Sequence, residues 1–84
     1  EGNTVDYAGE NGIYVNPSSF VDIIGNFVNF AGWDGIQVNG GTNNEASSNT
    51  VLGSGGSGIV FNNSDIFEII ANTASNNGVD GIQV

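Results

Sequence analysis

Cysteine, histidine, lysine, arginine and methionine are all absent from this chain of 84 residues, and proline occurs once. Without cysteine and histidine the chain can form no disulfide, no zinc site built from these ligands, and no thiol or imidazole catalyst. Without a basic side chain it has no cationic patch for nucleic acid. No apolar run approaches the roughly 18 residues that a membrane-spanning helix needs. We therefore expect neither a nucleic-acid partner nor membrane insertion.

The residues that are present are acidic or small. The chain has 14 glycines and nine acidic residues, which give a formal net charge of −9. The length allows one small domain, residues 1–84, and a lone core of this size would bury only about 60% of the unfolded surface. Because methionine is missing, we expect a processed mature form or a segment of a longer protein.

A repeat of 23 residues runs through the whole chain. The strings NGIYV, DGIQV, SGIVF and DGIQV recur at this interval, and four asparagines keep the same phase. Such a repeat indicates stacked structural units. The units are a partial one at 1–15 and complete ones at 16–38, 39–61 and 62–84. The repeated residues are Gly12, Gly35, Gly58 and Gly81, and Asn3, Asn26, Asn49 and Asn72.

Each complete unit contains three short extended stretches, for example 20–24, 27–30 and 35–38, separated by turn residues. Every window of about 11 residues contains glycine, proline or asparagine, which disfavour helix interiors. Three strands cannot bury their apolar faces within one unit, but units stacked about 4.8 Å apart can. The repeat therefore predicts an all-β parallel solenoid with three strands per rung. Dividing 84 residues by 23 gives about 3.65 rungs, and neither end has a recognisable cap.

Alternation of apolar and polar residues predicts which side chains enter the core. In the strand that follows each repeated glycine, the first and third residues should point inward. These predicted core residues are Ile13, Ile36, Ile59 and Ile82, and Val15, Val38, Phe61 and Val84.

The asparagine column predicts a tight corner, because asparagine tolerates left-handed or bridge backbone conformations. If the amides turn inward, stacked copies can hydrogen-bond to one another and to the corner carbonyls. A simpler alternative is that each asparagine is only a turn residue. We expect the repeated glycines to mark the last corner, where the missing Cβ lets the chain turn into the next strand.

The unit IIGNFVNFAGWDGIQVN resembles the parallel β-helix repeats of the pectin-lyase-like superfold, especially the Asn-rich, GI-containing repeats of large secreted and periplasmic proteins. The resemblance covers the whole chain and implies a right-handed coil of three sheets. It also implies an extracellular or cell-surface location. It does not imply one activity, because the superfold includes lyases, hydrolases, epimerases, tailspikes, adhesins and structural proteins.

No catalytic residue can be assigned from this resemblance. Lyases of the superfold use a lysine or arginine base, and this chain has neither. Hydrolases use clustered carboxylates. The candidate pair, Asp34 and Asp80, lies two rungs apart with Ser57 between them, and an acidic or small polar residue before glycine is ordinary at a corner. We therefore expect a protein that is not an enzyme.

Two groups of residues are candidates for binding. Asp22, Glu45 and Glu68 form an outward column in which neighbouring carboxylates about 5 Å apart repel by about 0.8 kcal/mol in water. This column is either a solvated face, a weak calcium or magnesium contact, or a contact for a positively charged partner. Tyr14 and Trp33 are candidates for glycan contact, with scattered surface aromatics as the alternative.

These observations favour a non-catalytic structural module that needs no cofactor, and weakly bound Ca²⁺ at the acidic column is the one alternative. We expect it to associate end to end with copies of itself or with flanking repeats, as a filament, envelope layer, stalk or adhesin segment. The alternative is a repeat segment of a carbohydrate-active or polysaccharide-binding β-helix whose active residues lie elsewhere.

Overall fold

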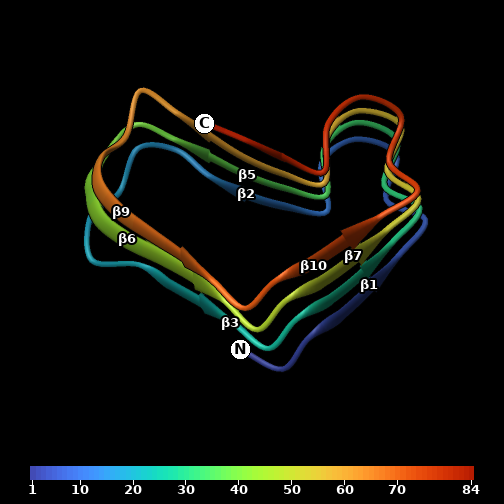
Figure 1. Ribbon diagram of the computed structural model, residues 1–84, viewed down its shortest axis with the longest axis horizontal. Coiled ribbons are helices and arrows are strands. Elements are labelled where there is room, and N and C mark those ends of the chain that lie inside the picture. Colours follow the sequence, from blue (N-terminus) through green and yellow to red (C-terminus); the bar gives the residue numbers. More distant parts are fainter.

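Equivalent residues of successive units lie over one another in the computed structural model, which describes all 84 residues (Figure 1). The molecule is a parallel β-solenoid of about three turns with rungs of about 23 residues and no helix. The predicted fold class is therefore confirmed. Three parallel sheets enclose the interior, and the chain passes through them in the order A, B and C within each turn.

The strands are short because each rung turns three corners within 23 residues. Sheet A contains β1 (Thr4–Asp6), β4 (Phe27–Asn29), β7 (Thr50–Leu52) and β10 (Thr73–Ser75). Sheet B contains β2 (Ile13–Val15), β5 (Ile36–Asn39), β8 (Ile59–Asn62) and β11 (Ile82–Gln83). Sheet C contains β3 (Asp22–Ile24), β6 (Thr42–Ser47) and β9 (Asp65–Ile70).

The core consists of apolar columns along the solenoid axis. Ile36, Ile59 and Val38 are fully buried, and Phe61 packs against Phe67 with ring centroids 5.1 Å apart. The prediction that all copies are core residues is wrong for the last turn. There Ile82 is 44% and Val84 is 74% exposed, because no further rung covers them. Ile13 and Val15 in the first turn are partly buried and pack against the core.

The four repeated asparagines form a hydrogen-bonded ladder inside the corner between sheets C and A. The Oδ1 atom of Asn49 accepts bonds from the backbone N–H and the Nδ2 atom of Asn26, at 2.9 and 3.0 Å. Its Nδ2 donates to Oδ1 of Asn72 at 2.9 Å and to the Ile23 carbonyl at 2.8 Å. Asn3 donates to Asn26 in the same way. Asparagine here satisfies polar groups that the corner buries.

We predicted that the asparagine itself would adopt the left-handed conformation at this corner. The structure shows instead that the residue before it does so. The exposed residues Gly2, Gly25, Ser48 and Ala71 have φ between 54° and 64°. All four residues face solvent, so the residue before the asparagine makes the turn while the asparagine directs its amide inward. Glycine is the residue that accepts this backbone conformation without a Cβ penalty.

The glycines of the GI motif lie at the corner directly before the strands of sheet B, and they provide space there rather than a left-handed turn. None of Gly12, Gly35 and Gly58 has a positive φ. A Cβ added to Gly35 would collide with Cγ1 of Val51 and would lie 2.7 Å from the carbonyl oxygen of Gly58. The missing side chain therefore lets neighbouring rungs approach closely.

A second polar ladder, which the sequence did not predict, lies at the corner between sheets A and B, directly before the GI glycines. The backbone N–H of Asp34 donates to Oδ1 of Asn11 at 3.0 Å, and the N–H of Ser57 donates to Oδ1 of Asp34 at 2.8 Å. The N–H of Asp80 in turn donates to Oγ of Ser57 at 3.2 Å. Asp34 therefore has a structural role, because its carboxylate accepts a bond from the next rung.

Candidate functional site

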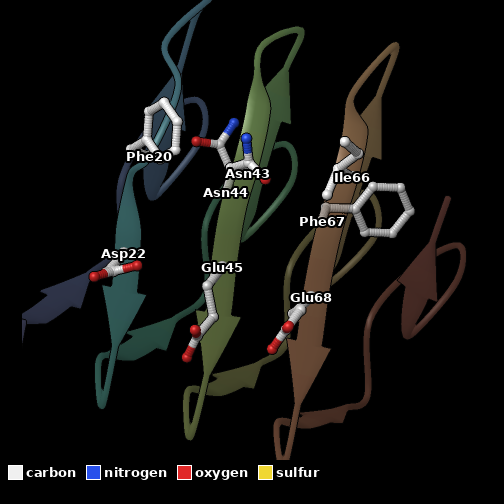
Figure 2. Close-up of a pocket in the computed structure, with 8 residues that line it drawn as sticks. All are labelled: Phe20, Asp22, Asn43, Asn44, Glu45, Ile66, Phe67 and Glu68. Atoms are coloured by element: carbon white, nitrogen blue, oxygen red, sulfur yellow. The ribbon is translucent and has the colours of Figure 1, made fainter.

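A shallow pocket of about 300 Å³ lies on the outer face of sheet C (Figure 2). It combines acidic, amide and apolar side chains from all three strands of the sheet and from Phe20, two residues before β3. Its lining residues are Phe20, Asp22, Asn43, Asn44, Glu45, Ile66, Phe67 and Glu68.

Strand register places the three carboxylates of the pocket in one row. Asp22 pairs with Glu45 across β3 and β6, and Glu45 pairs with Glu68 across β6 and β9. Figure 2 shows the three side chains extending from adjacent strands along one edge of the pocket. The pairing makes the row a direct consequence of the 23-residue repeat.

A backbone kink forms the opposite edge of the pocket. Phe20, Asn43 and Ile66 occupy equivalent positions and have φ values of 59°, 57° and 49°. This conformation is costly for a β-branched residue such as Ile66. Phe20 and Ile66 are strongly exposed, whereas Asn44 is buried and holds the kink by accepting a 2.9 Å bond from the Val21 N–H and donating a 2.8 Å bond to the Ser18 carbonyl. The repeat alone did not identify this edge.

The carboxylate row does not form a chelating metal site. No group of three or more acidic side chains comes close enough to hold one ion. Calcium usually takes six to eight oxygen ligands, and single carboxylates on successive strands provide few of them. No basic side chain is present to pair with the row. What the row provides is an uncompensated negative potential beside an apolar edge.

Replacing Glu45 with glutamine tests the repulsion within this row. Glu45 has a carboxylate neighbour on each side, so we expect the free energy of unfolding to rise by about 0.5–1 kcal/mol at low ionic strength. The gain should disappear in about 1 M salt, which reduces the screening length to about 3 Å. Asp65→Asn is the matched control, because Asp65 is exposed and pairs with Thr42. Equal effects of both substitutions on denaturant unfolding would contradict repulsion within the row.

The same measurements test cation binding by the row. We expect calcium to raise the melting temperature of the unsubstituted protein no more than sodium chloride of equal ionic strength. A selective rise that Glu45→Gln removes would instead establish a calcium contact.

The two aromatic side chains proposed for glycan contact are exposed but lie outside the pocket. Tyr14 is 51% and Trp33 is 57% exposed, and neither lines a pocket. The sequence did not identify a third aromatic feature, the stacked pair Tyr7 and Phe30. Their ring centroids lie 5.2 Å apart with an interplanar angle of 17°. Both residues are exposed and have a positive φ, and the Phe30 ring covers the position of Gly53 in the next rung.

Comparison with known families agrees with this geometry. The family described as the right-handed β-helix region matches residues 1–84. The chain belongs to this right-handed β-helix family. No curated protein and no solved structure matches it. The structure of this β-helix contains no helix long and apolar enough to cross a membrane.

Proposed function

We propose that this β-helix is a non-catalytic structural module of the extracellular space or cell surface that associates end to end. Such a module would form part of a filament, an envelope layer, a stalk or an adhesin. The observation that carries the proposal is the chemistry of the two terminal rungs, which present core side chains and unpaired ladder groups at opposite ends.

The apolar surfaces at both ends support this proposal. At the first rung a pocket of about 280 Å³ opens onto core side chains that include Val5, Ile13 and Val15. At the last rung Ile82 and Val84 are exposed. Burial of apolar surface contributes about 25 cal/mol per Å². Covering either surface with another rung would therefore be favourable.

The polar groups at the two ends are complementary. In the interior, each asparagine of the ladder accepts bonds from the backbone N–H and Nδ2 of the asparagine one rung earlier. At the first rung Oδ1 of Asn3 accepts no such bond, and at the last rung the backbone N–H of Asn72 donates none. A donor at one end and an acceptor at the other describe a head-to-tail interface, which extends without closing. The net charge of −9 would keep such polymers apart laterally.

Sedimentation velocity and electron microscopy of the purified chain over a range of concentrations test this proposal. We expect concentration-dependent linear assemblies. Val84→Asp should abolish them, because it places a charge on the last rung's core face. Val79→Asp is the matched control, since Val79 is 69% and Val84 is 74% exposed and Val79 lies in a loop. A monomer at high concentration, or equal effects of the two substitutions, would contradict end-to-end association.

The alternative function is binding of a polysaccharide by a repeat segment whose active residues lie elsewhere. The stacked and exposed rings of Tyr7 and Phe30, together with Tyr14 and Trp33, favour it because flat aromatic faces suit sugar rings. Binding of an oligouronate at millimolar concentration by a chain that forms no polymer would support this alternative over the structural proposal.

A further inference from the structure

Three Asn-Gly pairs occur in the chain, and this dipeptide has an intrinsic chemistry of its own. They are Asn11–Gly12, Asn39–Gly40 and Asn77–Gly78. The backbone nitrogen of the glycine can attack the side-chain carbonyl carbon of the asparagine, closing a succinimide ring and releasing ammonia. Water then opens the ring to aspartate or isoaspartate. Glycine favours the reaction because it has no Cβ to shield the nitrogen or to restrict the backbone.

In the β-helix, the backbone N–H of each of these three glycines donates a hydrogen bond to a carbonyl of a neighbouring rung. The N–H of Gly12 donates to the Asp34 carbonyl at 3.1 Å, that of Gly40 to the Asn62 carbonyl at 2.7 Å, and that of Gly78 to the Ser54 carbonyl at 2.8 Å. Each nitrogen must lose its proton and approach the side chain, so its hydrogen bond must open first. Such opening is local and differs from place to place in a fold.

The three asparagines differ in whether their side chains form hydrogen bonds: those of Asn11 and Asn77 do, and that of Asn39 does not. Asn11 is held at both ends of its amide, with Nδ2 donating to Oε1 of Gln37 at 2.8 Å and Oδ1 accepting from the Asp34 N–H. Asn77 accepts a 2.9 Å bond from the Ser54 N–H, and its Nδ2 atom has no hydrogen-bond partner but is enclosed by protein atoms. Asn39 is half-buried at the end of β5, and its side chain makes no hydrogen bond. Only the Asn39 amide is therefore free to rotate toward the following nitrogen.

The corner after Asn39 is also the only one of the three in which two glycines follow the asparagine. Gly40 and Gly41 follow it, with φ values of 82° and 81°, whereas the preceding rung has Pro17 and Ser18 at these positions. Two consecutive glycines gain the most conformational entropy when a segment opens. This corner joins sheets B and C at the left of Figure 1, away from the ladder corners. Local opening there frees the Gly40 nitrogen without breaking either polar ladder.

We propose that Asn39 is the deamidation site of the folded protein and that the rungs protect Asn11 and Asn77. The reaction consumes one water and releases one ammonia, and the new carboxylate changes the net charge from −9 to −10. Where the product is isoaspartate, an extra methylene enters the backbone at a residue that pairs with Asn62 of β8. The modification therefore marks, and weakens, the pairing between β5 and β8.

Peptide mapping of the full chain after incubation at mildly alkaline pH tests this proposal. Cleavage after acidic residues places the three pairs in separate fragments, residues 11–22, 35–45 and 69–80. In guanidinium, where the fold is lost, we expect one common rate. In the folded protein, we expect Asn11 and Asn77 to react at least about tenfold more slowly than Asn39 because their sites need larger opening. The readout is the mass change from amide to acid in each fragment.

Two variants make the comparison specific. Gln37→Ala removes the acceptor of the Asn11 amide and should accelerate deamidation at Asn11 alone. Asn39→Gln should abolish the signal in fragment 35–45 and leave the other two fragments unchanged. Equal rates at all three pairs in the folded protein, or a reaction that is faster at Asn11 or Asn77, would overturn the proposal. So would an Asn39 that stays unmodified while the denatured chain reacts.

Discussion

Replacing Asn49 with alanine is expected to lower the free energy of unfolding by about 3–5 kcal/mol, because each buried group left without a partner costs about 1–3 kcal/mol. The side chain is 1% exposed. Its loss removes the acceptor of the Asn26 N–H and Nδ2 and the side-chain donor to the Ile23 carbonyl. A small domain is stable by only about 5–15 kcal/mol, so the rung pairing should be severely weakened. Denaturant unfolding followed by circular dichroism measures the loss.

The matched control is the same substitution at the first rung. Asn3 is exposed and only donates to Asn26, so Asn3→Ala should cost about 1 kcal/mol or less. A ratio of at least about three between the two losses is the expected result. Equal losses would mean that the asparagines act as turn residues and that the ladder adds little.

Replacing Gly35 with alanine is expected to destabilise the fold by about 3 kcal/mol or more, because overpacking a close-packed interior usually costs about 1–3 kcal/mol and here the backbone is involved. The added Cβ would collide with Val51, and it would lie 2.7 Å from the Gly58 carbonyl oxygen and 2.9 Å from Oγ of Ser54. The Val51 side chain can shift, but the Gly58 carbonyl belongs to the adjacent rung. The cost should therefore appear as a wider separation of β5 and β8.

Gly81→Ala provides the control within the same column. Its Cβ would meet no atom closer than 3.6 Å, which is ordinary van der Waals contact. We expect this variant to unfold within about 0.5 kcal/mol of the original, as surface substitutions usually do. If both alanine variants were equally destabilised, local backbone preference and not the spacing between rungs would explain the glycines.

The repeat was sufficient to predict the fold class because a constant phase leaves few ways to pair strands. The recurrence of glycine and asparagine every 23 residues places Val28 beside Val5 and Val51, and the structure has this register. Alternation then separates the inward Ile36 from the outward Gln37. Neither step needs knowledge of the corners, since stacked strands fix the register of one another.

The conformation of the corners could not be predicted from residue type, because several residue types occupy the same strained positions. The left-handed residue before the ladder is glycine in two rungs, but Ser48 and Ala71 in the others. Glycine in the GI motif has two common explanations, a positive φ or a close approach, and only coordinates distinguish them. At Gly35 the close approach applies.

The sequence predicted the acidic edge of the candidate site but not its apolar edge. The column of Asp22, Glu45 and Glu68 follows from period and alternation, and the register brings the three together. The apolar edge formed by Phe20 and Ile66 depends on a kink within the strand, which alternation cannot predict. A mixed column of Phe, Asn and Ile gives no single turn signal.

Scalar couplings across hydrogen bonds, measured by nuclear magnetic resonance on the isotopically labelled chain, test the stacking of the rungs most directly. The structure predicts a coupling between the amide nitrogen of Ile36 and the carbonyl carbon of Gly58, and another between the amide nitrogen of Thr50 and the carbonyl carbon of Asn26. Both hydrogen bonds join adjacent rungs, as expected for parallel strands. Couplings that pair strands within one unit, or short contacts between α-protons typical of antiparallel neighbours, would contradict the account.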